Sequence, residues 1–419
     1  MRKILHSDLN NFYASVECLL NPDLKDYPVV VCGRVEDRHG IVLAKNMIAK
    51  KAGIKTGMVL YEAKNLCPNL KCVEAHHDIY LAYSRAVKDI YREYTDRVES
   101  FGIDEAWLDI TNVKKHGGDP FKIAEEISSR IKTEIGLTVS IGVSFNKVFA
   151  KLASDMKKPD AITVVSAENY KEKVWPLPVG DLLYVGRKTK AKLKDMAINT
   201  IGDLARFDQS ILTKKLGKVG TMLSIYARGE DQEIVHTKAE MQEIKSVGNS
   251  LTYYRDIKTD QDAFALITLL AESVSARMAS YGFALARTVH ITIISSELEY
   301  TTRMSKMHPT CLAEQIAKEA FALFKKNFAW GNSLVRGLGV AVSDFCEEEQ
   351  LSIENLTDNS QKKKKLQNTI ESLRSRFGRN IINKAVIFAD KHMQSMNILE
   401  THTENIGKQV SHGLKEEII

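Results

Sequence analysis

Three acidic residues have the types and the surroundings needed to bind a divalent cation. Asp8 lies in the apolar segment 4–9, and Asp104 and Glu105 are adjacent within the segment 101–109. A carboxylate in an apolar strand is costly to bury unless it is paired or coordinates a metal. A solvated turn between two strands would also account for the adjacent pair. If the two segments are neighbouring strands, the three carboxylates form an oxygen cage that suits Mg²⁺.

The segments around these acids alternate between strand and helix patterns. Short apolar, β-branched runs predict strands, and apolar residues at helical spacing predict amphipathic helices. The predicted strands are 4–9, 27–32, 41–43, 137–142 and 161–165, and the predicted helices are 12–20, 78–94 and 121–135. This mixture predicts an α+β domain with a small insertion between Tyr13 and His76.

A different organisation follows residue 174. The prolines in the run 175–178 predict a linker, and the sequence 179–229 predicts short helices joined by glycine turns. Strands and helices then alternate in the order of a split β-α-β-β-α-β unit, and the tail from residue 345 is polar with one helical stretch at 366–377. The alternating segments are 244–253, 260–280, 288–294, 300–304, 310–326 and 334–342.

The bulk composition is that of an ordinary globular protein with several domains. At 419 residues, two to four domains are expected. The net charge of +6 permits a polyanionic partner without requiring one. The six cysteines form no CxxC pair, which argues against a zinc site or a disulfide framework. No uninterrupted apolar run approaches about 18 residues, so we expect a cytoplasmic protein without a membrane segment.

Several motifs occur together in one order along the chain. The first runs from Asp8 through Tyr13 to Glu17, and the second spans 104–109. Others lie at 142–160, 185–189 and 245–248. Together they resemble the Y-family (translesion) DNA polymerases over about 340 residues, in the UmuC-like and DinB-like branch of bacteria and their mobile elements.

The resemblance implies a fold and an activity. The fold would be an α+β, multidomain right-hand polymerase with a palm, small fingers, a helical helix-hairpin-helix thumb, a β-α-β-β-α-β little finger and a C-terminal tail. The activity would be template-directed, low-fidelity extension of a primer with dNTPs past DNA damage, in an SOS-type response. The expected domains are the palm at 1–13 and 77–174, the fingers at 14–76, the thumb at 175–239, the little finger at 240–344 and the tail at 345–419.

The resemblance also implies roles for the three acids. Asp8, Asp104 and Glu105 would be the catalytic acids and would bind two Mg²⁺ ions, for which Mn²⁺ is a possible substitute. The main-chain carbonyl of Leu9 would be a further ligand. Asn10 stands where many relatives carry another acid, so we do not expect it to bind metal.

The nucleotide site is implied by the same resemblance. Tyr13, next to Phe12, would be the steric gate, a ring beneath the sugar that leaves no room for a 2′-hydroxyl. Lys50 and Lys158 would contact the triphosphate. Met47 replaces a polar side chain that is common in the family, and the neighbouring Asn46 is a candidate replacement. Without the family, Tyr13 is a core aromatic and each lysine is a solvated surface charge.

DNA contacts are expected from the thumb and the little finger. A glycine turn can present backbone amides to a DNA phosphate while lysines add charge. The first candidate turn, at 186–189, resembles a helix-hairpin-helix, and a second copy follows at 217–220. The expected contact residues are Gly186, Arg187, Lys188, Thr189, Gly217, Lys218, Gly220, Lys245 and Ser246, with Arg255, Arg287 and Arg303 as further candidates.

The polar tail carries a segment that resembles a sliding-clamp peptide. Gln350, Leu351 and Ile353 would bind the clamp, although the usual terminal aromatic is missing. A requirement for a UmuD-like accessory subunit stays open. Two alternative functions remain: a catalytically silent scaffold of the same fold that binds DNA and the clamp, and another palm-type enzyme such as a nucleotide cyclase. The cyclase leaves the thumb and the third domain without a role.

Overall fold

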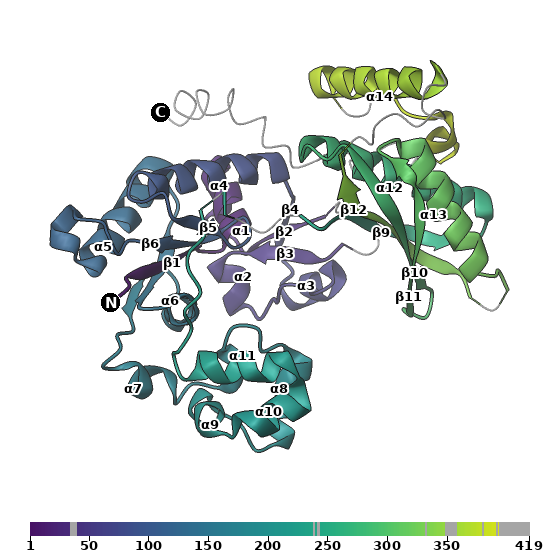
Figure 1. Cartoon of the computed structure of the whole chain (residues 1–419). Helices are drawn as coiled ribbons and strands as arrows, with labels where there is room; N and C mark the ends of the chain where they lie inside the picture. Colours follow the sequence, from purple (N-terminus) through teal and green to yellow (C-terminus); the bar gives the residue numbers. More distant parts are fainter. Residues whose placement is uncertain are drawn as a thin grey trace. The chain divides into compact units, whose positions relative to one another are not determined.

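The structure is a computed structural model of the chain, and it describes residues 1–33, 40–237, 239–240, 244–331, 333–347, 358–378, 381–390 and 393. The chain forms two compact units, Met1–Met241 and Gln242–Ile406 (Figure 1). The first contains the mixed α/β region and the short helices, and the second contains the split β-α-β-β-α-β unit. The predicted α+β, multidomain fold class is confirmed.

A five-stranded sheet forms the centre of the first unit. Its strands lie in the order β5-β6-β1-β7-β8. The middle strand, β1, is antiparallel to both β6 and β7, and all of its residues are buried. The strand that carries Asp8 is therefore the central strand of the sheet. The strands are β1 (Ile4–Leu9), β5 (Val98–Ser100), β6 (Glu105–Asp109), β7 (Val139–Ser144) and β8 (Ile162–Val164).

One face of this sheet is apolar and covered by three helices. Leu5 and Leu9 of β1 point to this face, because alternate residues of a strand point the same way. Both join a core with Val87 of one helix and Ile127 of another. The covering helices are α1 (Phe12–Leu20), α4 (His77–Arg92) and α5 (Pro120–Arg130), and α5 continues into a π-helical turn, Ile131–Ile135.

The opposite face carries the two titratable residues of β1, His6 and Asp8. Ile4 packs there against Ala150 of helix α6 (Lys147–Met156). His6 and Asp8 follow Ile4 at two-residue intervals, so they share its face. The helix α6 lies on this side of the sheet (Figure 1) and determines what surrounds the charged groups.

Glycine at position 142 allows α6 to lie directly on β7. A Cβ atom at Gly142 would lie 1.9 Å from the Ala150 carbonyl oxygen and 2.5 Å from the Ser154 amide nitrogen. Gly142→Ala must therefore push α6 off the sheet, and we expect the free energy of unfolding to fall by about 3 kcal/mol. Urea denaturation measures the loss. Gly186→Ala is the control, because no described atom lies within 4 Å of its Cβ position; equal losses in both variants would contradict the prediction.

Within the predicted insertion between Tyr13 and His76, α1 packs on the central sheet, and residues 29–74 form a small sheet with a separate core. The middle strand, β2, pairs antiparallel with β3 and parallel with β4. Val30, Val42 and Leu60 belong to this separate core. The elements are β2 (Val29–Cys32), β3 (Val42–Lys45), α2 (Met47–Lys51), α3 (Leu60–Leu66) and β4 (Lys71–Glu74).

Short helices complete the first unit (Figure 1). They share one apolar core with part of α6, to which Phe149, Leu193 and Leu223 contribute. Because this core includes α6, the helical region is anchored to the sheet. The helices are α7 (Tyr170–Val174), α8 (Arg187–Asp195), α9 (Ile201–Arg206), α10 (Gln209–Leu216) and α11 (Lys218–Ala227).

The segment after α11 is bound to the sheet region by hydrogen bonds. The guanidinium of Arg2 donates to the carbonyls of Asp231 at 2.9 Å and Glu233 at 2.7 Å. The carboxylate of Glu99 accepts from the His236 backbone N–H at 2.8 Å. This segment is therefore part of the first unit.

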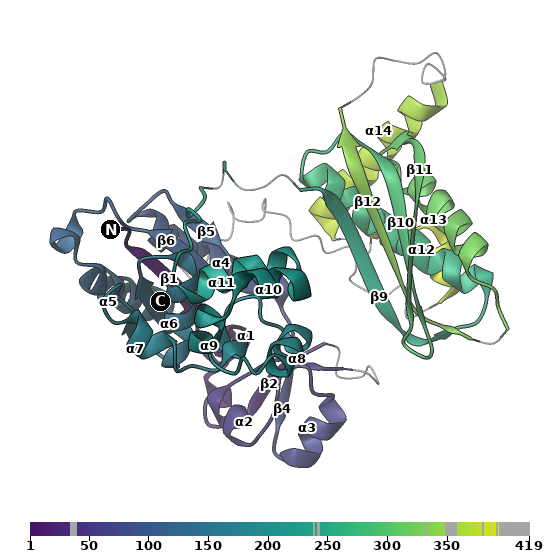
Figure 2. The ribbon, with the colours of Figure 1, turned by 60° about the horizontal axis from the view of Figure 1, so that its bottom comes forward.

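The second unit contains a four-stranded antiparallel sheet with two helices on one face (Figure 2). The strand order is β11-β10-β12-β9. The predicted β-α-β-β-α-β order is confirmed by the chain order of the elements. They are β9 (Ser246–Ile257), α12 (Asp260–Ser280), β10 (Leu285–Ser295), β11 (Tyr300–Thr310), α13 (Ala313–Asn327) and β12 (Val335–Cys346).

The core helix α12 is the one described helix that is long and apolar enough to cross a membrane. The sequence predicts this helix at 260–280 but not its suitability for a membrane, because polar residues interrupt its apolar run. Of its most apolar stretch, 78% is buried inside the protein. Leu266, Leu270 and Val274 pack in the same core as Val289 of the sheet. The burial explains the apolar composition without a membrane.

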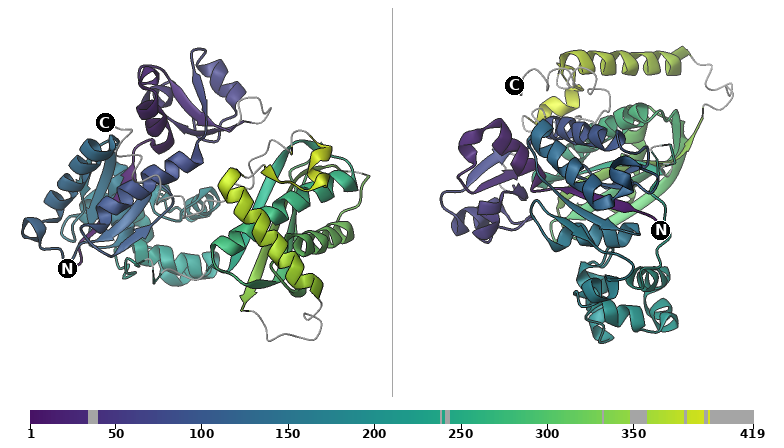
Figure 3. Two further views of the ribbon diagram at one scale, coloured as in Figure 1. Left: turned by 90° about the horizontal axis from the view of Figure 1, so that it is seen from above. Right: turned by 90° about the vertical axis from the view of Figure 1, so that its left-hand side faces the viewer.

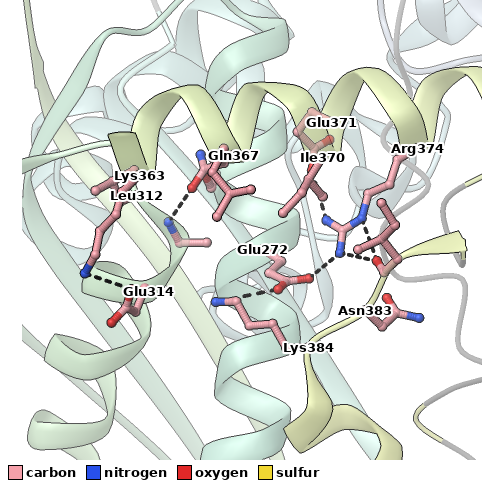
Figure 4. Close-up of a pocket in the computed structure, with 14 residues that line it drawn as sticks. Glu272, Leu312, Glu314, Lys363, Gln367, Ile370, Glu371, Arg374, Asn383 and Lys384 are labelled. Atoms are coloured by element: carbon pink, nitrogen blue, oxygen red, sulfur yellow. Dashed lines mark hydrogen bonds and ion pairs between the residues drawn. The ribbon is translucent and has the colours of Figure 1, made fainter. Parts of the chain in front are cut away.

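Helix α14 (Asp358–Phe377) packs on the helices of the second unit (Figure 3). The Arg374 guanidinium lies 2.9 Å from the carboxylate of Glu272 in α12, and both side chains are buried. The Gln367 amide donates to the hydroxyl of Ser275 at 2.8 Å. A cavity of about 200 Å³ lies between α14 and the helices beneath it, and Lys384 also lines it (Figure 4). The helix is thus attached through buried polar contacts.

The residues after α14 continue this attachment. Ile387 and Met393 are buried in the apolar core of the second unit. The carboxylate of Asp390 accepts from the Tyr253 hydroxyl at 2.7 Å and pairs with Arg255 at 3.2 Å. Part of the tail therefore packs as an integral layer of this unit.

Candidate active site

The register of the central strands brings two of the predicted acids together. Asp8 lies directly opposite Glu105 in the pairing of β1 with β6. Directly opposite residues of antiparallel strands point to the same face. Asp104 comes immediately before β6, and its carbonyl accepts from the Leu9 backbone N–H at 3.0 Å. The acids therefore meet where β1 ends and β6 begins.

Two lysines are paired with these carboxylates. The Lys151 ammonium lies 2.9 Å from Glu105 and 3.3 Å from Asp8. The Lys158 ammonium lies 2.6 Å from Asp8 and 2.7 Å from Asp155. Burial lowers the pKa of each lysine, but the neighbouring carboxylates outweigh it and raise both pKa values above the ordinary one. Both ammonium groups are therefore charged at neutral pH.

His6 lies on the same face of β1 as Asp8 and is fully buried. Burial, followed by the charge of Lys151, lowers the pKa of His6 to about 3, so the imidazole is neutral. Its Nδ1 lies 2.9 Å from the Ser154 hydroxyl, and its Nε2 lies 3.3 Å from Glu105 Oε2. The Ser154 hydroxyl donates to the Lys151 carbonyl at 2.7 Å, so it accepts from His6 Nδ1–H, and the neutral imidazole carries its proton on Nδ1. His6 thus connects β1 to helix α6 beside the Glu105 carboxylate.

Asp104 is electrostatically coupled to the other two acids. Burial, together with the carboxylates of Asp8 and Glu105, raises the pKa of Asp104 above its usual range. The charge of Asp104 also contributes to a raised pKa of Tyr13, after the larger effect of burial. Asp104 therefore lies within electrostatic range of both the acid pair and the Tyr13 ring.

The oxygen donors fit a hard divalent cation. Among the described residues, no three His, Cys, Asp or Glu side chains come close enough together to hold one metal ion. Asp8 and Glu105 nevertheless share one face, and Asp104 responds to the charge of both. Mg²⁺ commonly takes only one or two carboxylates and completes its shell with water and substrate phosphates. The donor set is consistent with that mode of binding.

The ring of Tyr13 is held by an aromatic neighbour. Tyr13 lies in the first turn of α1 and is half-buried, whereas Phe12 is buried. The Tyr13 ring stacks on Tyr80 of α4, with centroids 4.2 Å apart and an interplanar angle of 14°. The Tyr80 hydroxyl donates to the buried carboxylate of Glu17. This support fixes the plane of the Tyr13 ring while part of it stays accessible.

Asn46 has a structural function at the start of α2. Its side-chain oxygen accepts from the backbone N–H groups of Ala49 at 2.9 Å and Val29 at 3.1 Å. Its amide nitrogen donates to the Tyr27 carbonyl at 2.8 Å. Asn46 thereby caps the helix that carries Lys50, whose side chain is exposed.

The first candidate turn of the helical region is solvent-exposed. Gly186 is the N-cap of α8, and Arg187 and Lys188 of its first turn are exposed, whereas Thr189 is half-buried. The N-terminal N–H groups of a helix are available to a phosphate. The geometry therefore agrees with the predicted phosphate contact.

The second candidate turn divides into exposed and buried parts. Gly217 has a φ of +64° between α10 and α11, and the next residue, Lys218, is exposed. Gly220 is buried, and a Cβ there would lie 2.3 Å from the Leu212 carbonyl oxygen. Gly220 therefore serves the close packing of two helices rather than an accessible surface.

The candidates in the second unit differ in accessibility. Lys245 and Ser246 are exposed at the start of β9. Arg303 of β11 is also exposed, whereas Arg255 is paired with Asp262 at 3.2 Å and with Asp390. Gln350, Leu351 and Ile353 lie outside the described residues.

Sequence reasoning missed two residues of the site, Lys151 and His6. A signal for each was present. Lys151, Asp155 and Lys158 recur at intervals of four and three residues, which is the spacing of one helix face. His6 precedes Asp8 by two residues, which is the spacing of one strand face.

The chain matches three family models. The impB/mucB/samB family matches residues 7–155, and the C-terminal domain of that family matches residues 244–355. The model described as the DNA polymerase-iota thumb domain matches residues 180–231. The last range covers both candidate phosphate turns.

Among solved structures, the chain has the fold of Y-family DNA polymerases. It matches a Y-family polymerase chimera of Dbh and Dpo4 with a TM-score of 0.72 and 24% identity. It matches DinB of Sulfolobus solfataricus with a TM-score of 0.55, also at 24% identity. Both matches cover 83% of this chain and all of the solved chain.

Curated relatives cover nearly the whole chain. DNA polymerase IV of Acetivibrio thermocellus is 48% identical over 93% of this chain and 98% of the relative. DNA polymerase IV 1 of Bacillus subtilis is 38% identical over 91% of this chain and 92% of the relative. With these relatives, the chain belongs to the impB/mucB/samB family of Y-family DNA polymerases.

Proposed function

We propose that this chain is a template-directed DNA polymerase that extends a primer with dNTPs at low fidelity and continues past damaged template bases. One observation carries the proposal: Asp8 and Glu105 face each other on the central strands, beside Asp104, in a chain 48% identical to a DNA polymerase IV. The biological role that follows is translesion synthesis in DNA repair and SOS-type damage tolerance.

The acids are the proposed metal ligands. Asp8, Asp104 and Glu105, with the Leu9 carbonyl, would hold two Mg²⁺ ions, and Mn²⁺ can substitute. When bound, such ions would make the primer hydroxyl more acidic and would stabilise the charge on the leaving pyrophosphate. His6 lies beside Glu105, and the Ser154 hydroxyl holds its imidazole at 2.9 Å.

The proposed nucleotide site surrounds these acids. The ammonium groups of Lys158 and Lys50 would bind the triphosphate oxygens as charge-assisted donors. Phe12 and Tyr13 would lie beneath the incoming nucleotide, with the accessible part of the Tyr13 ring against the sugar. Asn46 supports this site indirectly by capping the helix of Lys50.

The proposed DNA contacts are phosphate contacts. The exposed amides and side chains at 186–189 would bind one strand, and Gly217 and Lys218 would bind at the second turn. Lys245 and Ser246 would add contacts from the second unit. Phosphate contacts position DNA without reading its sequence, which suits an enzyme that must accept any template.

Two partners and a location complete the proposal. Gln350, Leu351 and Ile353 would bind a sliding clamp, and a UmuD-like subunit is a candidate accessory protein. The expected location is the cytoplasm, where DNA, clamp and dNTPs are available.

Primer extension tests the proposed function. The protein is incubated with a primed template, four dNTPs and Mg²⁺, with and without an abasic site in the template. We expect extension on both templates and its loss when EDTA removes the metal. Binding of the primed template without extension would instead support a silent scaffold and overturn the proposal.

A further inference from the structure

Lys151 joins two carboxylates that come from different strands. Its ammonium lies 2.9 Å from Glu105 of β6 and 3.3 Å from Asp8 of β1. Lys158 contacts Asp8 and Asp155 but not Glu105, and Asp155 also lies 3.3 Å from the Lys151 ammonium. The Lys151 ammonium therefore bridges the two central strands. The Lys151 side chain is 14% exposed, against 29% for Lys158.

The backbone of Lys151 is held firmly over the sheet. The side-chain oxygen of Asn146 caps α6 by accepting from the Phe149 N–H at 2.8 Å. Gly142 removes the Cβ that would otherwise keep the helix away. One turn further on, Ser154 contacts the His6 imidazole at 2.9 Å. Because these contacts fix α6 on the sheet, they place the backbone of Lys151 within reach of both acids.

An ammonium in this place has two opposing effects. It brings two negative charges together that would otherwise repel each other. It also uses the same carboxylate oxygens that a divalent cation requires. In a partly buried site such competition is strong, because the effective dielectric constant is well below that of water.

We infer that Lys151 is a positioning residue that holds the Asp8 and Glu105 carboxylates together and competes with a divalent cation for their oxygens. The inference rests on the proposed function for the identity of the site. In this view Lys151 lowers the affinity of the acids for divalent cations. Cations then bind tightly only when a nucleotide supplies further oxygens.

Mn²⁺ titration of the nucleotide-free protein, followed by electron paramagnetic resonance of the unbound ion, tests this inference. Lys151→Met keeps most of the side-chain volume and removes the charge. We expect the variant to bind Mn²⁺ about tenfold more tightly than the unmodified protein. We also expect Mn²⁺ to raise its melting temperature by a larger amount, because at a given concentration a ligand that binds more tightly stabilises the folded state more.

Two matched variants separate the local effect from a change in net charge. Lys157→Met removes the same charge from an exposed position close by, and Lys151→Arg keeps the charge in place. Both should bind Mn²⁺ like the unmodified protein. Relative to Asp8→Asn alone, the double variant Lys151→Met, Asp8→Asn should gain less than tenfold in Mn²⁺ affinity, because one of the carboxylates for which Lys151 and the cation compete is gone.

Each outcome decides the inference. Equal or weaker Mn²⁺ binding by Lys151→Met would overturn it, as would an equal gain in Lys157→Met. Circular dichroism shows whether Lys151→Met is folded; if it is not, Lys151→Gln is used in its place with the same expectation. Failure of the proposed function is seen separately, because it appears as absence of primer extension by the unmodified protein.

Discussion

Asp104→Ala is expected to lower the rate of primer extension by at least about 1,000-fold, equivalent to roughly 4 kcal/mol of transition-state stabilisation. The carboxylate is partly buried, and burial, together with the charges of Asp8 and Glu105, raises its pKa. Removing it deletes an oxygen donor at the place where the chemistry would occur. Single-turnover extension of a primed template with one dNTP measures the loss.

Binding of DNA should survive this change. The predicted phosphate contacts lie in the helical region and at the start of β9, away from residue 104 in the sequence. Asp89→Ala is the matched control, because that carboxylate is largely exposed on α4. Extension by Asp104→Ala within tenfold of Asp89→Ala would argue against a metal-binding function of the acids.

Tyr13→Ala is expected to lower discrimination against ribonucleotides by about 100-fold, equivalent to roughly 2.7 kcal/mol. The ring stacks on Tyr80 at 4.2 Å, so it cannot move away from a 2′-hydroxyl in the direction of α4. Without the ring, the space beneath the sugar is open. The ratio of kcat/KM for dCTP and CTP opposite a template guanine measures the discrimination.

Tyr13→Phe separates the ring from its hydroxyl. The phenyl ring can keep the stacking on Tyr80, so we expect discrimination close to that of the unmodified enzyme. Tyr80→Ala should give an intermediate loss, because Tyr13 then lacks its support. If Tyr13→Ala still rejects ribonucleotides as well as Tyr13→Phe does, the sugar is selected elsewhere.

Elements with a strong local signal could be predicted from the sequence with accurate bounds. The strand at 4–9 coincides with β1, since its six residues are all buried and flanked by polar ones. The helix at 260–280 coincides with α12, which begins after Thr259, whose hydroxyl accepts from the Asp262 N–H. In both cases the residue types next to one another in the sequence determine the burial or the helix cap.

Elements that depend on distant pairing were predicted too short. The strand predicted at 300–304 extends to Thr310, because it pairs along β10 as far as Ala286. Its residues are mostly exposed, so no apolar alternation marks its length. Helix α14 begins at Asp358, ahead of the predicted 366, because consecutive lysines hide the helical period.

The candidate site could be predicted only where a residue type is costly to bury. The acids stand out in apolar segments, so Asp8 and Glu105 were identified before their register was known. Lys151 and His6 make contacts across 46 to 148 residues of sequence; local spacing indicates the face on which each lies but not its distant partner. Asn46 was expected at the nucleotide, and its hydrogen bonds show a capping function that depends on the neighbouring strand.

The attachment of α14 has a practical consequence for protein engineering. A recombinant fragment that stops at Cys346, the end of β12, would lack Ile387 and Met393, and would leave the buried Glu272 without Arg374. An unpaired carboxylate beside newly bared apolar side chains favours aggregation during expression. The shortest soluble version of the second unit should therefore run through residue 393.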